Sequence, residues 1–392
     1  MGSANRMALE QRRIEIHCKE HRVCVILLPY LTEIVMKFQT YHHRLSITLF
    51  FGCLCFVISS CGPATLAPSP TATSTLALTS TTIPTFTPEP SLTPTPKEVP
   101  VLCGGPPAMF ILLVGSDARQ DSYAIGLADS IRVVRLDFIE PRIQVLAFPR
   151  DLYVEIPEIE DHNNITHGKL NQAYLYGNPG YNYYDGTGQG PGLLALTLEQ
   201  NFGVQVDHYV AVNLQTFVRI VDELGGIKID LPYEIDGRVK GSRDQNRVFA
   251  AGEQHLNGYR TMLLARLRSE GDFSRIEIQN LILQSFAEKL LSPAAILKLP
   301  ELIETFSEAV QTDLGPAEIA QLLCLRTRLD MQNIQFGNFP ENLFENGRVQ
   351  DPVLGNTSIL KVDFDVLRAY VQRFNSGNWP RGQQSPRDTI LP

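Results

Sequence analysis

The segment at positions 62–100 sets the limits within which this chain can fold. Its sequence, GPATLAPSPTATSTLALTSTTIPTFTPEPSLTPTPKEVP, consists mostly of Thr, Pro, Ser and Ala. Such a segment buries too little apolar surface to offset the conformational entropy lost on folding, so we expect a disordered linker over 62–102. The folded part of the 392-residue chain must then begin near Cys103.

The residues before the linker have the pattern of an export signal. The stretch HHRLSITLFFGCLCFVISSCG has a basic start, an apolar run and then Ile58-Ser59-Ser60-Cys61. It resembles a bacterial lipoprotein signal, in which Cys61 is the acylated first residue after cleavage. The apolar run is short for a spanning helix, which needs about 20 residues, and an uncleaved membrane anchor is the alternative. Both readings place the bulk of the chain outside the cytoplasm, anchored to the cell membrane.

The signal pattern begins naturally at Met36, with Lys37 and Arg44 flanking the apolar run. No globular pattern is visible in residues 1–35. We therefore interpret 1–35 as a non-native extension and 36–61 as the lipoprotein signal peptide.

Of the seven cysteines, four belong to residues 1–60 and Cys61 carries the lipid, which leaves Cys103 and Cys324. An even pair in an oxidising compartment suggests one disulfide. Two unrelated buried thiols are the alternative.

The net charge of −8 and the pI of about 5.6 argue against a nucleic-acid binder, which needs a broad basic surface. Clustered arginines in such an acidic chain suggest a focused anion site, with ordinary ion pairs as the alternative.

Short apolar or alternating runs predict strands, and longer amphipathic runs predict helices. The predicted strands lie at 109–115, 129–137, 142–148, 152–156, 208–213 and 227–231. The predicted helices lie at 193–202, 214–224, 256–266 and 273–291, with further helical patterns at 294–299, 301–310, 316–329 and 362–374. Strands mixed with amphipathic helices predict a layered α/β domain, which we place at 103–345 and follow with a tail at 346–392. The stretch 167–192 has the composition of a glycine-rich, aromatic loop.

Charged residues interrupt the apolar stretch at 263–283, LLARLRSEGDFSRIEIQNLIL. If one helix holds the whole stretch, positions 268, 272, 275 and 279 project within a narrow sector. Buried arginines are costly unless they meet anions, so this sector predicts an anion site.

Further polar residues fall at the ends of predicted strands, where ligands tend to bind in open α/β sheets. Asp117 and Arg119 follow the first strand, Asp129 begins the second, and Arg150 follows the third. Each has an ordinary alternative, such as a turn cap or a surface ion pair.

Taken in order, these motifs resemble the LytR-CpsA-Psr family of cell-envelope phosphotransferases. The resemblance covers roughly Phe110 to Leu291 and rests on LLVGSDAR, ADSI, FPRDLYVEIP, HGKLNQAY, GPGLLALTLEQNFG, DHYVAVNLQTFVRIVDELGG, AGEQHLNGYRTMLLARLR and DFSRIEIQ. It implies a three-layer α/β/α sandwich around a mixed central β-sheet. It also implies an enzyme that moves a phosphate-linked glycopolymer from a polyprenyl diphosphate carrier to peptidoglycan or another surface acceptor, with Mg²⁺ as cofactor.

The resemblance assigns roles to individual residues. Asp117 and Asp129 match two aspartates associated with Mg²⁺ and the diphosphate, and oxygen ligands suit this hard cation. Guanidinium groups suit bidentate phosphate contacts, and the matching clamp arginines are Arg119, Arg150, Arg268 and Arg275. The remaining matches are Arg266 in an Arg-x-Arg motif, Asp272 as an orienting carboxylate, Gln279 as a hydrogen-bond donor to a phosphate oxygen and Lys169 near the site. Of this set, Asp117, Asp129, Asp272 and Arg275 are the candidate catalytic residues.

Three departures from the family pattern lie close to these residues. Leu127 stands where an arginine is frequent, Ile278 precedes Gln279 where an arginine is frequent, and the gap between Arg268 and Asp272 is short. A non-catalytic surface lipoprotein that binds polyprenyl phosphates or glycans is therefore one alternative, and a polyprenyl diphosphate hydrolase is another. The apolar Leu281, Ile282 and Phe286, with the helices at 193–202 and 214–224, are candidates for an isoprenoid groove. Plain core packing is the alternative for them.

Overall fold

The computed structural model describes residues 100–119, 121–267 and 272–380. The predicted export signal, the lipidation site Cys61 and nearly all of the linker lie outside these residues.

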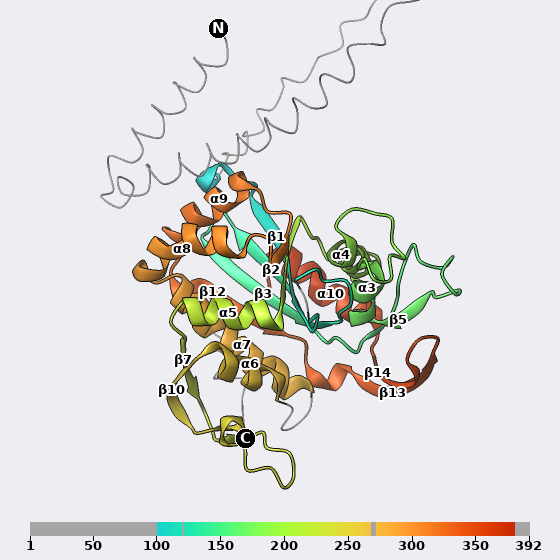
Figure 1. The fold of residues 1–392 in the computed structure, drawn as a ribbon. Coiled ribbons are helices and arrows are strands. Elements are labelled where there is room, and N and C mark those ends of the chain that lie inside the picture. Colours follow the sequence, from blue (N-terminus) through green and yellow to red (C-terminus); the bar gives the residue numbers. More distant parts are fainter. Residues whose placement is uncertain (1–99, 120, 268–271, 381–392) are drawn as a thin grey trace, which may run out of the picture. The chain divides into compact units, whose positions relative to one another are not determined.

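A mixed six-stranded sheet forms the centre of the domain, in the order β11-β6-β1-β2-β3-β12 (Figure 1). Its strands are β1 (Ala108–Ser116), β2 (Ala128–Asp137), β3 (Arg142–Phe148), β6 (His208–Asn213), β11 (Val310–Thr312) and β12 (Ile334–Asn338). The β1–β2, β2–β3 and β6–β11 pairs are antiparallel, whereas β1–β6 and β3–β12 are parallel. Strands β1 to β3 are buried along most of their length because both faces of the sheet are covered.

Helices cover the sheet on both faces (Figure 1). One face packs on α3 (Leu170–Gly177), α4 (Gln189–Phe202) and α10 (Phe364–Asn375), in a core that includes Leu112, Tyr174 and Phe374. The other face packs on α7 (Asp272–Leu290) and α9 (Pro316–Arg326), in a core that includes Val134, Leu325 and Phe336. The predicted α/β/α sandwich around a mixed sheet is confirmed.

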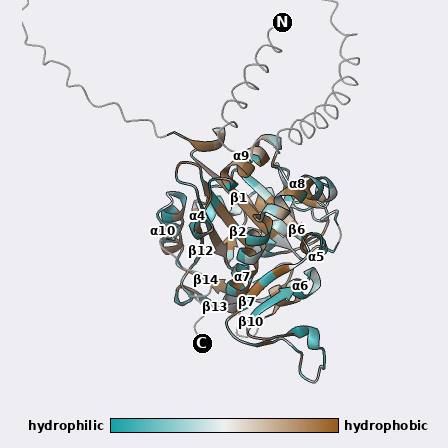
Figure 2. Ribbon diagram, turned by 90° about the vertical axis from the view of Figure 1, so that its left-hand side faces the viewer, coloured by the Kyte–Doolittle hydropathy of each residue, from teal (hydrophilic) through white to brown (hydrophobic). Residues whose placement is uncertain are grey.

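A second apolar cluster lies beside this sandwich. It is formed by α7 with β7 (Ile227–Leu231), β10 (Gly252–Leu256), α5 (Leu214–Glu223) and α6 (Gly258–Arg266), and α8 (Pro293–Phe306) borders it. In Figure 2 β10 is largely hydrophilic, in keeping with the alternate exposure of its side chains. Leu281 and Ile282 belong to this core, in keeping with the alternative of plain core packing. Phe286 packs against the same cluster.

The stretch 263–283 is not one helix. Helix α6 ends at Arg266, the backbone at Leu267 is extended, and α7 begins at Asp272. Ser269 and Gly271 in the intervening sequence are weak helix formers. Of the four positions predicted to share a helical face, 272, 275 and 279 lie on α7, and Arg268 lies outside the described residues.

The chain after residue 340 contributes to the same domain. It forms η4 (Glu341–Leu343), the hairpin of β13 (Glu345–Asp351) and β14 (Gly355–Lys361), and α10. Phe374 is fully buried, with its ring 6.2 Å from that of Phe110 on β1. The remaining short elements are η1 (Leu102–Gly104), β4 (Tyr153–Glu155), β5 (His167–Lys169), β8 (Ile235–Asp236), η2 (Gln245–Arg247), β9 (Val248–Phe249) and η3 (Met331–Asn333).

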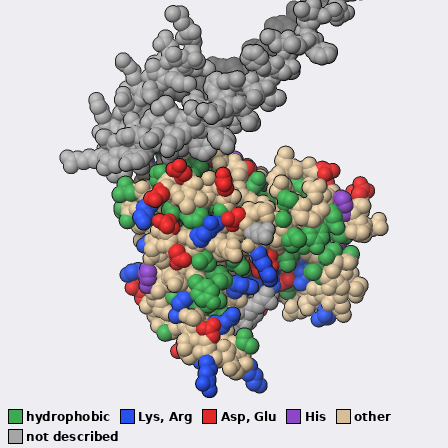
Figure 3. Space-filling view, in the orientation of Figure 1, with side chains coloured by type: hydrophobic (Ala, Val, Ile, Leu, Met, Phe, Trp, Pro, Cys, Tyr) green, Lys and Arg blue, Asp and Glu red, His purple; other side chains and the backbone are tan. Residues whose placement is uncertain are grey.

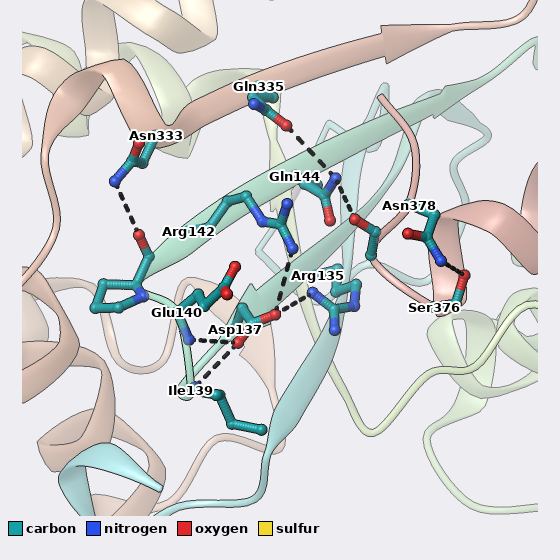
Figure 4. A network of polar contacts seen from close by, with 12 residues as sticks. Arg135, Asp137, Ile139, Glu140, Arg142, Gln144, Asn333, Gln335, Ser376 and Asn378 are labelled. Atoms are coloured by element: carbon teal, nitrogen blue, oxygen red, sulfur yellow. Dashed lines mark hydrogen bonds and ion pairs between the residues drawn. The ribbon is translucent and has the colours of Figure 1, made fainter. Parts of the chain in front are cut away.

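A polar network fastens the end of α10 to the sheet (Figure 4). The Arg135 guanidinium on β2 pairs with Asp137 at 2.8 Å and donates to the carbonyl oxygen of Asn375 at 3.2 Å. The Gln144 amide on β3 donates to the Pro380 carbonyl at 3.0 Å. The sequence places this segment in a separate tail, but its packing makes it part of the sandwich.

Cys103 and Cys324 form a disulfide that joins η1 to α9, with a Cα–Cα distance of 5.7 Å. Of the two alternatives left by the sequence, the structure has the bonded pair. Within the described residues, each helix is too short or too polar to cross a lipid bilayer.

Candidate functional site

A β-bulge at the start of β2 positions the first site residue. Ser116 pairs with Ala128 and Gly115 pairs with Ser130, so Asp129 is an extra residue in β2. Bulges re-aim side chains and are frequent beside active sites. Here the bulge brings the Asp129 carboxylate against the Arg150 guanidinium, two residues past the end of β3.

Arg150 and Asp129 begin a chain of ion pairs. The Arg150 Nε also lies 3.3 Å from the Asp151 carboxylate, which accepts from Lys169 Nζ at 2.9 Å. The side chains in these ion pairs are each less than a third exposed. Partly buried charges interact more strongly than surface pairs, so the geometry here is firmly held. The predicted Arg150, Asp129 and Lys169 are therefore brought together.

Arg275 and Gln279 approach the same place from α7. Arg275 is only 6% exposed, and both residues line a small pocket with Asp129, Arg150 and Asp151. We call this the arginine pocket; its remaining lining residues are Ser130, Ile131, Arg132, Ala147, Phe148, Pro149, Ile276 and Leu360. Leu360 comes from β14, whose backbone amide at this residue donates to the Asp151 carbonyl at 2.8 Å.

Arg132 is a pocket residue that the sequence reasoning missed. It is 2% exposed and lies on β2, three residues after Asp129. Burial, and then the charge of Arg275, lower the pKa of the Arg132 guanidinium to about 9. A signal was present in the sequence, because Arg132 and Arg135 are three apart and must point to opposite faces of a strand covered on both sides.

A second, larger pocket of about 460 Å³ lies at the segment between β1 and β2. We call it the outer pocket; it is lined by Asp117, Arg119, Ser122, Ala124, Ile125, Gly126, Leu127, Leu175 and Tyr181. Leu127 lines this pocket and Asp129, two residues on, lines the arginine pocket. Figure 3 shows basic and acidic side chains next to one another in the middle of one face, beside an area of hydrophobic side chains.

Asp117 is held by the backbone of the loop that closes the outer pocket. Its Oδ1 accepts from the Leu127 amide at 2.6 Å, and its own amide donates to the Leu127 carbonyl at 3.1 Å. Arg119 is exposed nearby and lines the same pocket.

Three predicted residues are not brought into either pocket or cannot be placed. Arg266 is exposed in the last turn of α6 and lines neither pocket. Arg268 lies outside the described residues, as does the side chain of Asp272, although Asp272 begins α7. Gln279 differs from the prediction in another way, because its amide donates to the Ala265 carbonyl at 3.0 Å and its oxygen accepts from Arg132.

The donor set at this edge suits a hard cation only in part. Among residues 100–119, 121–267 and 272–380, no three His, Cys, Asp or Glu side chains gather as a metal site. Asp117 and Asp129 nevertheless carry carboxylate oxygens at the adjoining ends of paired strands, and Mg²⁺ is commonly held by one or two carboxylates together with substrate phosphates. The two aspartates therefore fit a cation that is bound jointly with a diphosphate.

The chain is similar to known cell-envelope proteins along its sequence. Polyisoprenyl-teichoic acid–peptidoglycan teichoic acid transferase TagV of Bacillus subtilis (strain 168) is 29% identical over 211 residues, which make up 53% of this chain and 50% of TagV. Regulatory protein MsrR of Staphylococcus aureus (strain COL) is 29% identical over 215 residues, 54% of this chain and 58% of MsrR. The chain thus spans about half the length of the curated relatives it matches.

Solved structures share the fold. The crystal structure of B. subtilis TagV superposes with a TM-score of 0.52 at 25% identity, over 68% of this chain and 96% of that chain. The crystal structure of gbs0355 from Streptococcus agalactiae has a TM-score of 0.55 at 20% identity, over 71% of this chain and 90% of that chain.

The model of the LytR_cpsA_psr family matches residues 105–368, a range that contains the central sheet and both pockets. The chain belongs to the LytR-CpsA-Psr family.

Proposed function

We propose that this protein transfers a phosphate-linked glycopolymer from a polyprenyl diphosphate carrier to peptidoglycan or another cell-surface acceptor. The observation that carries the proposal is the arginine pocket, where Arg150 and the buried Arg275 lie beside Asp129 at one end of the sheet. TagV, which shares the family and 29% of the matched residues, is named a teichoic acid transferase.

The arginines bind the diphosphate. Their forked donors suit bidentate contacts with phosphate oxygens, and a buried site strengthens such contacts. Arg119 in the outer pocket provides a further positive charge at the adjoining position. Mg²⁺, held by Asp117 and Asp129 with the diphosphate, would neutralise charge on the phosphate oxygens.

The transfer itself exchanges one P–O bond for another. A hydroxyl oxygen of the acceptor forms a bond to the sugar-proximal phosphorus, and the bond from this phosphorus to the bridging oxygen breaks. Polyprenyl phosphate leaves with the bonding electrons, and the guanidinium groups stabilise the charge on its oxygens. The hydroxyl proton passes to Asp117 or Asp129, the two carboxylates at this edge of the sheet.

The apolar side of the outer pocket is the proposed contact for the first isoprenoid units. Ile125, Leu127 and Leu175 line it next to Arg119 and Asp117. A site for a lipid head group needs such an apolar wall beside the polar residues.

Transfer of a radiolabelled lipid-linked glycan by the full chain, in detergent with Mg²⁺, tests the proposal. We expect Arg150→Met and Asp129→Asn to reduce transfer by about 10²–10³-fold, as removal of one preorganised charge stabiliser does elsewhere. Arg219→Met is the matched control, since Arg219 is an arginine paired with an aspartate, Asp121, outside both pockets.

The same assay separates the alternatives. Binding without turnover in wild type would replace the transferase by a non-catalytic lipid-binding protein; the relative MsrR is named a regulatory protein. Release of free glycan phosphate without an acceptor would identify a hydrolase. Wild-type transfer by Arg150→Met would remove the proposed mechanism.

We further propose that Cys61 carries a lipid that holds the protein at the outer face of the cell membrane. Replacement Cys61→Ser should release the protein from the membrane fraction if the signal is cleaved. Retention in the membrane would favour an uncleaved anchor.

A further inference from the structure

We infer that Arg132 is a positioning residue of the arginine pocket: its buried charge makes the pocket attractive to a diphosphate, and its hydrogen bonds hold the start of α7 in place. The inference rests on the proposed function and adds a residue that the family motifs do not include.

Two buried arginines on β2 differ in how their charges are balanced. Arg135 is 7% exposed, faces α10 and pairs with the Asp137 carboxylate at 2.8 Å (Figure 4). Arg132 is 2% exposed and faces α7 on the opposite side of the strand. Among the described residues, every hydrogen-bond acceptor of Arg132 is a neutral oxygen.

The stability of the fold does not account for a charge at this position. Arg132 lies in the same row of β2 as Val134 and Leu136, which belong to an apolar core. An apolar side chain would continue that row, whereas a buried cation balanced only by neutral oxygens is destabilising. Apolar packing alone therefore does not explain a charged side chain at this position.

The position of Arg132 indicates what the charge serves. The charged residues that line the arginine pocket are three arginines and two aspartates: Arg132, Arg150, Arg275, Asp129 and Asp151. Lys169, which pairs with Asp151 at 2.9 Å, gives the positive groups a small excess over these two carboxylates. Arg132 increases this excess from a buried position, which favours the binding of a diphosphate.

Arg132 also fixes the residues that face the ligand. Its guanidinium donates to Gln279 Oε1 at 3.3 Å and to Asn280 Oδ1 at 3.2 Å, and it reaches the Ile276 carbonyl at 3.4 Å. Asn280 in turn donates to Asn338 on β12 at 3.0 Å. These hydrogen bonds link β2, α7 and β12 next to Arg275, the residue that precedes Ile276 on α7.

Binding of farnesyl diphosphate to the full chain, measured by calorimetry at several salt concentrations, tests the inference. We expect Arg132→Met to weaken binding roughly tenfold or more, because a charge within several ångströms of the ligand is lost at a buried site. The salt dependence of the affinity should fall as well. Arg132→Lys, which keeps the charge but not the fork, should retain most of that salt dependence.

Arg135→Met is the matched control from the same strand. It should lower the melting temperature and leave the affinity for farnesyl diphosphate unchanged, since Arg135 lies on the other face of the sheet. If Arg132→Met does not fold, Arg132→Gln supplies the uncharged comparison with Arg132→Lys, because glutamine keeps polar contacts without the charge.

The outcomes separate the inference from the proposed function. Wild-type binding and transfer together with unchanged affinity in folded Arg132→Met or Arg132→Gln would overturn the inference alone. Absence of farnesyl diphosphate binding in wild type would overturn both.

Discussion

Gly126 packs so closely against the end of β1 that a side chain has no room. A Cβ built on it would lie 2.7 Å from the Ala118 Cβ and 2.8 Å from the Ala118 amide nitrogen. We expect Gly126→Ala to displace Ala118 and the neighbouring Asp117, with a loss of stability of about 1–3 kcal/mol and reduced transfer. Melting temperature and transfer rate check this. Gly203→Ala is the control: a Cβ built on Gly203 meets no atom, but the φ angle of Gly203 is positive. This variant should lower stability without affecting transfer. Equal transfer by both variants would contradict the expectation.

Glu277 on α7 titrates in an unusual range. Burial, and then the charge of Glu341, raise the pKa of its carboxyl from 4.5 to about 7. The folded state therefore binds this proton more tightly, so the associated stability is complete below about pH 4.5 and is lost as the pH rises through 7. We expect Glu277→Gln to raise the melting temperature by a few degrees at pH 8 and to leave it nearly unchanged at pH 4.5. Glu288→Gln, at an exposed carboxylate of the same helix, should show no such difference between the two pH values.

At this scale the sequence identified several residues but not their grouping. Asp129 and Arg150 follow from polar residues at strand ends, and the structure pairs them. Asp117 lines a different pocket, because the loop after β1 folds back on Leu127. Arg132 was missed because an arginine within an alternating pattern is usually an exposed residue; only burial of both sheet faces makes it a site residue.

Helix α10 is the element that joins the end of the described chain to the core. Phe374 is fully buried, and its ring meets Phe110 edge-on. We expect Phe374→Ala to lower the free energy of unfolding by about 3–5 kcal/mol, as the loss of a buried aromatic ring does. Denaturant unfolding measures this. Gln372→Ala, exposed on the same helix, should change stability by less than about 0.5 kcal/mol. Similar losses in both variants would show that α10 is not part of the cooperative core.

The elements with a strong periodic pattern were predicted well, and those without one were not. The three long strands and helices α4 to α7 follow from apolar runs and amphipathic faces. The composition of residues 167–192 predicts a loop where helix α3 forms; all eight residues of α3 are buried, so its sequence shows no alternation between an exposed polar face and a buried apolar face. Strands β11 and β12 lie at the sheet edges, and β11 is too short to show alternation.

The disulfide acts on the molecule as a whole. It closes a loop with a sequence separation of 221 between Cys103 and Cys324. We expect the double replacement by serine to lower the free energy of unfolding by about 2–5 kcal/mol, mainly by freeing the unfolded chain. Thermal unfolding with and without a reducing agent checks this, because the reducing agent should lower the melting temperature of wild type only. An unchanged wild-type melting temperature on full reduction would contradict the expectation.

The same bond also determines how the domain responds to a mechanical pull. Any force arriving from residues that precede Cys103 meets the covalent link to α9 before it reaches β1. The tension is then shared with a helix on the far side of the sheet, and β1 is not peeled away from β2 and β6. The strand that carries Asp117 at its end can thus stay in register with β2 and β6 under a force applied through the residues before Cys103.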